Sequence, residues 1–537
     1  MAEQMLAADG RPLKSSLNRA LRRQKLRALM LIAPLLIFIL ITFIIPIGQM
    51  LFRSVENQIV GDTIPRTVDA ISDWNADAGA PPSEEVFIAL AKDLMIAVEE
   101  KNHTRLGSRL NYETSGISSL FRKSGRRVDD IGETYADQFI AVDAAWEEPG
   151  TWVTLFADPD WIARQAEWDG EGQEPAFVIA ETAAQALPKT AEMYADFAAV
   201  IRDVDNDSPT EEEPWNIVYL ALHEDLIANP QARIDGPLAG LVARTAEQAQ
   251  GFDREDVRAA FEDIDDDWLS IGVWQTIQTY SPTFTSGYFL NAVDLQKTPN
   301  GPEWQPENEQ IYLTLFWRTL VMSLTITVSC VLLGYPVAWM LANLPARKAN
   351  LLMILVLLPF WTSLLVRTSA WKVLLQQQGV INDTLVWIGL VADGNRLALI
   401  NNATGTIIAM THILLPFMIL PLYSVMKTIP PSYLRAAKSL GATNWTAFWR
   451  VYFPQSVPGI GAGCILVFIL AIGYYITPEI VGGTRGVFIS NRIAYHISTS
   501  LNWGLAAALG AILLAVVLIL YWAYDRIVGI DNVKLGG

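Results

Sequence analysis

Residues 433–454, YLRAAKSLGATNWTAFWRVYFP, form a polar stretch between two long apolar segments. The pair Pro430-Pro431 just before it can open a short helix, because the amide that a proline lacks would have no partner at that position. Gly441 can end this helix in the left-handed conformation that side chains disfavour. Thr443 or Asn444 can then cap a second helix, whose aromatic residues recur on one face at Trp445, Phe448, Trp449 and Tyr452. The stretch therefore predicts two short helices joined at a glycine, which together form a compact knob.

Six apolar segments accompany this stretch. They cover 28–52, 319–346, 351–366, 403–426, 457–478 and 504–524. A helix needs about 20 apolar residues to cross a bilayer, and all segments but the third qualify. We expect the third to recruit Arg367 to Trp371, since Arg and Trp are tolerated at the membrane interface. The first segment is too long for a cleaved signal peptide and is followed by no small-residue cleavage site. The sequence predicts an all-α membrane protein with six transmembrane helices.

Basic residues lie in three of the segments that flank these spans. The N-terminal tail, 1–27, holds seven basic residues against Glu3 and Asp9. Arg347 and Lys348 follow the second span, and the polar stretch with its flank contains basic residues but no acid. With six spans these three segments fall on one side, and the positive-inside rule makes that side cytoplasmic. We therefore expect both termini to be cytoplasmic.

Residues 54–310 form an acidic insert between the first and second spans. Residues 51–310 hold 49 of the 56 acidic and 18 of the 39 basic residues, a net charge of -31, whereas the rest of the chain has a net charge of +14. Ala, Glu, Asp and Leu dominate, which predicts a mainly helical domain with helices over about 83–101, 130–147, 175–203, 215–228, 237–250 and 253–279. No internal repeat is evident. Long domains cross membranes regardless of charge, so we expect the insert to be extracytoplasmic.

Signatures of catalysis and of metal binding are sparse. Asp203, Asp205 and Asp207 have the alternate spacing of a calcium loop, but Ser208 and Pro214 stand where that loop needs Gly and Glu. A solvated acidic loop is therefore the better interpretation. The sequence has no GxxxxGK[ST] motif that could cradle ATP phosphates. We expect no catalytic residue, no metal and no cofactor of the chain's own.

His412 lies inside a predicted span, and two roles are open for it. It can line a pathway, because ionisable groups at membrane depth usually face a cavity. It can also simply hydrogen-bond within the helix bundle, as polar side chains in membrane helices do. The two cysteines, Cys330 and Cys464, both fall in predicted spans, so the sequence has no disulfide framework.

The stretch 433–454 resembles the cytoplasmic coupling loop of ABC-importer permeases. In that family the loop reads Glu-Ala-Ala, three residues, Gly, nine residues, Ile, one residue and Leu-Pro. Here the matching positions and the aromatic residue between them are Arg435, Ala436, Ala437, Gly441, Phe448 and Pro454, with Val451 and Phe453 in place of the aliphatic pair. Arg435 replaces the family's Glu, which reverses the charge at the head of the loop.

The resemblance extends over about 282–528 and is to the spermidine/putrescine branch of binding-protein-dependent permeases. It is carried by segments such as LLPFWTSLLVRTSAW at 357–371 and ITPEIVGG at 476–483. It implies the six-helix fold of type-I ABC importers, with 28–52 as the first helix, the insert between the first two helices and the permease domain over 315–528. It also implies a solute pathway for polyamine-like or other small polar or cationic solutes. The pathway residues it implies are Trp361, Thr362, Arg367, Tyr474, Tyr475 and Glu479. Tyr474 stands where many polyamine-type permeases have an acid.

The same resemblance implies several partners in a bacterial inner membrane. These are a dimer of cytoplasmic ABC ATPase subunits that bind the ATP, a second permease subunit, a periplasmic solute-binding protein and the lipid bilayer. No nucleic-acid partner is expected. The alternative is a membrane-anchored sensor or assembly protein in which the external helical domain does the work. Such a sensor needs a cytoplasmic output domain, whereas the predicted tails are short.

Overall fold

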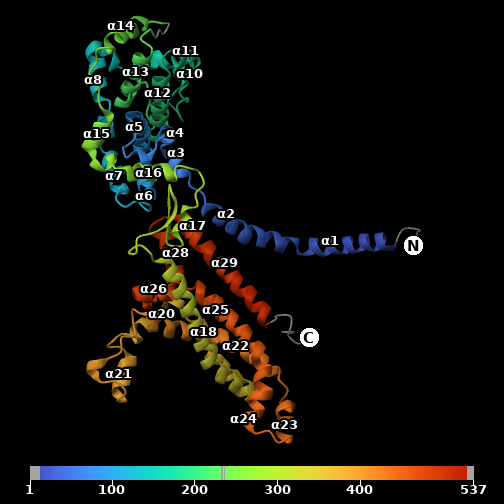
Figure 1. Cartoon of the computed structure of the whole chain (residues 1–537). Helices are drawn as coiled ribbons and strands as arrows, with labels where there is room; N and C mark the ends of the chain where they lie inside the picture. The colour runs from blue at the N-terminus through green and yellow to red at the C-terminus, as the bar shows by residue number, and fades with distance from the viewer. Residues whose placement is uncertain (1–12, 171, 232–233, 235, 529–537) are drawn as a thin grey trace. The chain divides into compact units, whose positions relative to one another are not determined.

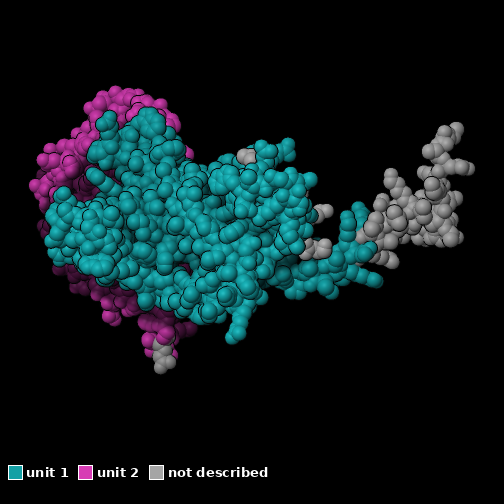
Figure 2. Space-filling model, turned by 90° about the horizontal axis from the view of Figure 1, so that it is seen from below, with its two compact units in different colours: residues 1–55, 288–295, 304–537 teal, residues 56–287, 296–303 magenta. Residues whose placement is uncertain are grey.

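The structure is a computed structural model that describes residues 13–170, 172–231, 234 and 236–528. The first twelve residues of the expected basic tail lie outside the described residues. The chain divides into two compact units, which Figure 2 shows in different colours. Unit 1 comprises residues 1–55, 288–295 and 304–537, and unit 2 comprises residues 56–287 and 296–303. The expected insert, 54–310, thus includes some residues that belong to unit 1.

Helices account for nearly all of the regular structure in the described residues (Figure 1). The exception is a hairpin of two short strands, β1 (Leu295–Thr298) and β2 (Gly301–Trp304), which the sequence analysis did not anticipate. The expectation of an all-α membrane protein is therefore confirmed in its main feature.

Five helices of unit 1 are long and apolar enough to cross a membrane, among the residues that the structure describes. They coincide with five of the predicted spans and cover Gln24–Arg53, Tyr312–Asn343, Ala403–Thr428, Asn444–Gly473 and Trp503–Arg526. The first is built from α1 (Leu13–Ile39), η1 (Leu40–Ile44) and α2 (Ile45–Arg53), and its most apolar part is not buried at all. Such a helix needs lipid or another chain around it, because water would leave its apolar side chains unfavourably hydrated.

The third predicted span is bent. Here α19 (Ala346–Leu357) and the 3-10 turn η7 (Leu358–Trp361) are followed by α20 (Leu364–Leu374), which turns away by 95°. Pro359 stands at the start of η7, where its missing N–H cannot continue the helical ladder. The pair is a broken span or a re-entrant loop, so the number of crossings is six only if the bent pair counts as one.

The core of unit 1 lies where α18 (Tyr312–Asn343), α22 (Ala403–Thr428) and α25 (Phe453–Gly473) pack against one another (Figure 1). Small residues let these helices approach closely, as is usual in membranes. A Cβ atom at Gly463 would lie 2.5 Å from Met418 Sδ, and one at Gly459 would lie 3.0 Å from Val425 Cβ. The helix pair α22–α25 therefore leaves no room for larger side chains at these two positions.

A buried carboxylate fixes the start of α18. The Asp294 oxygens accept the backbone N–H groups of Ile311, Tyr312 and Leu313 at 3.0, 2.8 and 2.8 Å. These amides have no partner inside the helix, so an external acceptor stabilises this end.

Shorter helices link the long ones in unit 1. They are α17 (Gly287–Asn291), α21 (Val380–Trp387), η8 (Asp393–Asn395), α23 (Pro431–Ser439), α24 (Asn444–Ala447), η9 (Phe448–Tyr452), α26 (Ile476–Val481), α27 (Gly483–Gly486) and α28 (Ile489–Ser498). The last long helix is α29 (Trp503–Val528).

Unit 2 is helical and has an aromatic core of its own. Its largest fully buried side chains include Trp146, Trp152, Trp161, Trp268 and Trp274. The helices are α3 (Gln58–Thr63), α4 (Pro65–Ile71), α5 (Glu84–Glu99), α6 (His103–Leu110), α7 (Ile117–Ser124), α8 (Glu133–Val142), α9 (Pro149–Phe156), α10 (Pro159–Glu167), α11 (Glu181–Ala186), α12 (Pro188–Val200), α13 (Asn216–Ala228), α14 (Ala239–Ala249), α15 (Val257–Ile264) and α16 (Ile271–Tyr280). Single turns add η2 (Ala76–Ala78), η3 (Val128–Asp130), η4 (Ala144–Trp146), η5 (Ile201–Asp205) and η6 (Asp266–Leu269).

The longer helices predicted for the insert are divided in the structure. The predicted helix 253–279 consists of α15, η6 and α16, because Asp265 leaves the helical conformation and caps η6. In the acidic loop, Asp203 accepts hydrogen bonds from Arg202 and Gln173, each at 2.8 Å. No group of three or more His, Cys, Asp or Glu side chains is arranged to hold a metal ion in the described part of the chain.

Candidate functional site

The polar stretch forms an elbow between α22 and α25, which we call the coupling elbow (residues 430–454). Helix α23 begins with Pro431 in its first turn and ends at Gly441, whose φ of 90° is left-handed. The Ala442 N–H donates to the Ala437 carbonyl at 3.1 Å and the Gly441 N–H to the Lys438 carbonyl at 3.0 Å, which satisfies the end of the helix. Thr443 Oγ1 accepts the Thr446 N–H at 3.2 Å and caps α24. The predicted proline start, glycine turn and threonine cap are all present.

The second helix of the elbow differs from the prediction. It is not a separate short helix, because α24 continues through the π turn η9 into α25 as one helix over Asn444–Gly473. The π turn comes directly before Pro454, whose missing N–H would interrupt a regular α-helical ladder at this place. The second helix of the elbow is therefore continuous with a helix that is long and apolar enough to cross a membrane.

The elbow exposes apolar side chains at its tip and is held by others at its base. Leu440 is 90% exposed and Trp445 is 72% exposed. Phe448 instead points into the bundle, with its ring centroid 6.2 Å from that of Tyr335 and 5.9 Å from that of Tyr452. Arg435, Ala436 and Pro454 are exposed, and Ala437 is half-buried. Exposed apolar groups gathered on a polar segment are typical of a docking surface.

The predicted pathway residues fall into three places. Trp361, which is 74% exposed, and Thr362 lie at the break between η7 and α20. The hydroxyl of Thr362 donates to the Pro359 carbonyl at 2.9 Å, which steadies the bend. The part of these two residues in a pathway stays a prediction.

Arg367 lies on α20 and is half-buried. Its Nε atom is buried and has no hydrogen-bond partner among the described residues. The indole N–H of Trp371 donates to His412 Nδ1 at 3.1 Å. His412, on α22, is exposed, and its bond to Trp371 links α22 to α20. The sequence analysis missed Trp371 as a partner, because residues 41 positions apart in different spans show no periodic relation.

Tyr474, Tyr475 and Glu479 lie where α25 ends and α26 begins, and helix α28 fixes this segment. Ser490 Oγ donates to the Tyr474 carbonyl at 2.6 Å. Asn491 Nδ2 donates to the Tyr475 carbonyl at 2.9 Å and to Glu479 Oε2 at 2.6 Å. Neither Ser490 nor Asn491 belongs to a motif that would have predicted these roles.

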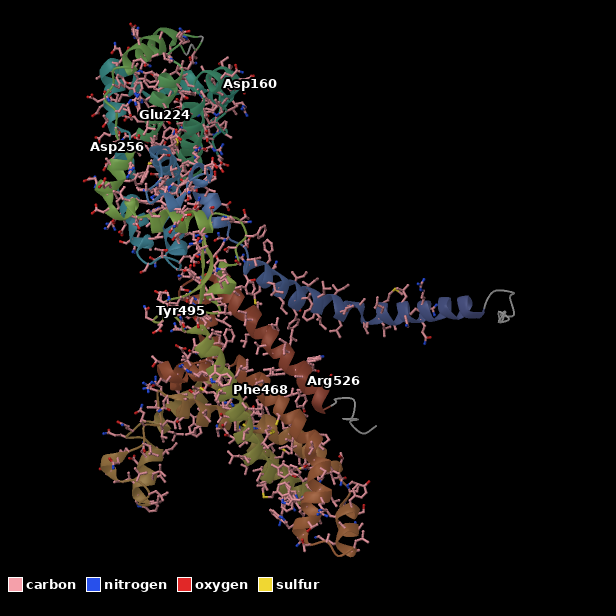
Figure 3. All side chains as sticks on the ribbon, in the orientation of Figure 1. Asp160, Glu224, Asp256, Phe468, Tyr495 and Arg526 are labelled. Carbon is pink, nitrogen blue, oxygen red and sulfur yellow. The ribbon has the colours of Figure 1, made fainter. Side chains whose placement is uncertain are left out.

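Tyr475 and Glu479 line a cavity of about 630 Å³. Its walls also include Arg318, Arg492 and Tyr495, the last of which is labelled in Figure 3. The Arg318 Nη1 group donates to the Thr484 carbonyl at 3.0 Å, and the Arg492 guanidinium lies 5.6 Å from the centre of the Tyr495 ring. The cavity thus combines one carboxylate, two guanidinium groups and two aromatic rings, a set able to hold a small polar solute.

Residues 314–528 match the family of binding-protein-dependent transport system inner membrane components. Over 222 residues the chain is 36% identical to the spermidine/putrescine transport system permease protein PotB of Salmonella typhi, an alignment that covers 41% of this chain and 77% of that protein. The chain belongs to this family. It is also 34% identical over 239 residues to the inner membrane ABC transporter permease protein YdcU of Escherichia coli (strain K12), covering 42% of this chain and 74% of that one.

Part of this permease also resembles a solved structure. That structure is of a bacterial alginate ABC transporter in complex with an alginate pentasaccharide-bound periplasmic protein, with 19% identity, a TM-score of 0.34, and coverage of 42% of this chain and 81% of that one. The predicted resemblance to binding-protein-dependent permeases is confirmed, and the chain is a multi-pass inner-membrane protein. All of unit 2 lies outside residues 314–528, which match the family.

Proposed function

We propose that this permease forms the solute pathway of an ABC importer and couples it to a separate ATPase through the coupling elbow. One observation carries the proposal: the elbow exposes Leu440 and Trp445 while Phe448 anchors it to the bundle. A partner bound at the exposed tip would move a helix that runs on without a break into the membrane. Such a connection is what alternating access requires, because two packings of the bundle must be shifted by an event at one end.

The proposed partners follow from the family. Two ATPase subunits bind ATP in the cytoplasm, and one of them receives the elbow. A second permease subunit completes the pathway, and a periplasmic solute-binding protein delivers the solute. The basic residues of the elbow favour the cytoplasmic side by the positive-inside rule, which leaves both termini cytoplasmic and unit 2 in the periplasm.

The proposed solute is polyamine-like or another small cationic or polar molecule. The naming of PotB as a spermidine/putrescine permease supports this class. The carboxylate of Glu479 and the ring of Tyr475 in one cavity offer charge pairing and cation–π contact to an alkylammonium group, whereas Arg318 and Arg492 in the same cavity suit the uncharged polar solutes of the proposed class. Tyr474 supplies an aromatic ring beside Arg367 instead of the acid of many polyamine-type permeases. Tyr474→Ala should therefore change the affinity or selectivity of uptake more than protein abundance.

The elbow can be tested by placing charge on its exposed tip. In Leu440→Asp and Trp445→Asp variants, we expect the cognate ATPase to be lost from the purified complex while the permease still inserts. Trp387 on α21 is 86% exposed and provides the matched control, so Trp387→Asp should retain the ATPase. Full retention of the ATPase by both elbow variants would remove the basis of the proposal.

A further inference from the structure

Two stretches of unit 2 share one sequence pattern. Residues 139–152 read FIAVDAAWEEPGTW and residues 261–274 read FEDIDDDWLSIGVW, with Phe, Asp, Trp, Gly and Trp at the same positions. Earlier in each half, VFIALAKDL at 86–94 corresponds to VYLALHEDL at 218–226, and IPRT at 64–67 corresponds to LPKT at 187–190. The matches occur in the same order. The expectation that the insert has no internal repeat is therefore wrong.

Corresponding residues also make corresponding hydrogen bonds. The Thr67 N–H and hydroxyl donate to Asp93 Oδ2 at 2.7 and 2.8 Å, and those of Thr190 donate to Asp225 Oδ2 at 2.8 and 2.7 Å. In each half, the indole N–H of the second tryptophan of the pattern donates to the carbonyl of the first. The distances are 2.8 Å within the first copy of the pattern and 2.7 Å within the second. Chance similarity of short motifs would not reproduce these bonds at matching positions.

The tryptophans of each copy pack into the other copy. The indole N–H of Trp146 donates to Thr245 Oγ1 at 3.0 Å, and that of Trp268 donates to Ser124 Oγ at 2.7 Å. Ser124 and Thr245 hold corresponding positions on α7 and α14. Likewise the ring of Trp152 lies 5.0 Å from Tyr219 in the second copy.

The reverse contact has the same geometry. The ring of Trp274 lies 4.9 Å from Phe87, which is the counterpart of Tyr219 in the first copy. The bridges at the ends of the repeats agree as well, because Glu56 pairs with Phe284 and Ala157 pairs with Ile179. The start of each copy thus pairs with a residue that follows a tryptophan segment.

The two copies meet around a pair of corresponding residues. Lys92 on α5 and Glu224 on α13 hold the same position in the two copies and form an ion pair with each other; Glu224 is labelled in Figure 3. In a twofold-symmetric dimer, a residue on the axis meets its own counterpart. A cavity of about 300 Å³, lined by Arg66, Lys92, Lys189, Glu192 and Glu224 among others, lies at this junction.

We propose that unit 2 is a duplicated unit whose copies, residues 56–156 and 179–280, have exchanged their tryptophan segments. Residues 133–156 of the first copy complete the second, and residues 257–280 of the second copy complete the first. In the first copy, Phe87, Phe121 and Ser124 then form the surface on which the tryptophan segment of the other copy docks. The two copies therefore pack against each other within one chain as the two subunits of a homodimer do.

Two matched ion pairs allow a direct test. Lys123 pairs with Asp265, and Arg244, the counterpart of Lys123, pairs with Asp143 at 2.8 Å. In the full-length protein, we would install the cysteine pairs Lys123→Cys/Asp265→Cys and Asp143→Cys/Arg244→Cys. The control pair, Lys123→Cys/Arg244→Cys, also spans the protease site but joins two residues that each pair with a different partner. Each variant also carries a protease site at Gly170, in an exposed loop between the copies.

Membranes that contain each variant are treated with a short bismaleimide and then with protease. A denaturing gel then distinguishes the exchanged arrangement from an unexchanged one. We expect both exchanged pairs to hold the cut chain together at full length and the control pair to release two fragments. The two aspartates that are replaced, Asp143 and Asp265, cap η4 and η6 in the same way. The variants therefore lose the same kind of capping hydrogen bond. Release of both fragments from the exchanged pairs, in protein whose buried tryptophan fluorescence is unchanged, would overturn the exchange.

Discussion

Replacing Gly441 tests whether the shape of the coupling elbow controls transport. Its φ of 90° is left-handed, and a Cβ atom there would meet nothing within 4 Å. The cost of a side chain is therefore conformational and not steric. It is about 1–2 kcal/mol for an ordinary residue, less for Asn and more for a β-branched residue. A penalty of this size shifts the balance between the native turn and its alternatives by roughly 5–30-fold.

The assay is ATP-driven uptake by the permease reconstituted with its ATPase and binding protein. We expect uptake to fall in the order Gly441→Asn, Gly441→Ala, Gly441→Val, with unchanged abundance in the membrane and with ATP hydrolysis that is lost or no longer linked to uptake. Gly48 on α2 is equally open but has no left-handed backbone, so Gly48→Val is the matched control. Normal uptake by Gly441→Val, or an Asn variant as defective as the Val variant, would refute the reasoning.

Four further predictions concern other parts of the chain. Asp294→Ala should leave the start of α18 without its acceptor and cost about 1–3 kcal/mol, seen as a lower unfolding temperature in detergent, whereas Asp294→Asn should cost less. Glu479→Gln should weaken uptake of a cationic solute at unchanged abundance, and equal loss for a neutral solute would argue against charge pairing. Deleting residues 60–275 behind a short linker should leave unit 1 assembled with the ATPase and flatten the salt dependence of uptake, because the acidic field would be gone; unchanged uptake at every ionic strength would exclude a role for that field. Burial, and then the charge of Arg254, lowers the pKa of His223 below its usual 6.5, so the stability of unit 2 should fall as the pH drops below about 6.5; His223→Gln should remove this dependence in pulse proteolysis, and His103→Gln should not.

The sequence was sufficient to predict the structure of segments whose conformation depends only on residues close together in the chain. The proline start of α23, the left-handed turn at Gly441 and the cap at Thr443 are local choices, and each was predicted. The five straight membrane helices followed from composition, because length and apolarity alone determine whether a helix can cross a bilayer. The 95° bend at Thr362 did not follow, since hydropathy averages over a window and records no change of direction.

Contacts between distant segments could not be predicted. The bond from Trp371 to His412, the clamp of Ser490 and Asn491 on the segment 474–479, and the cap of Asp294 on α18 join residues that no motif connects. The repeat in unit 2 escaped notice for a different reason. The spacing between matching segments changes from 123 to 132 to 122 residues, so no fixed period exists, and most shared positions are ordinary apolar ones.

The exchange of the tryptophan segments determines the order in which unit 2 can fold during its synthesis. As the chain emerges from the ribosome, Trp146 is synthesised 99 residues before Thr245, the residue to which it donates a hydrogen bond in the other copy. Likewise, Ser124 is synthesised 144 residues before Trp268, which donates a hydrogen bond to its hydroxyl. Neither half can complete its aromatic core until nearly all of unit 2 has been synthesised, and contacts so distant in sequence form slowly. During that interval the incomplete domain exposes large aromatic surfaces, which makes the nascent chain prone to aggregation.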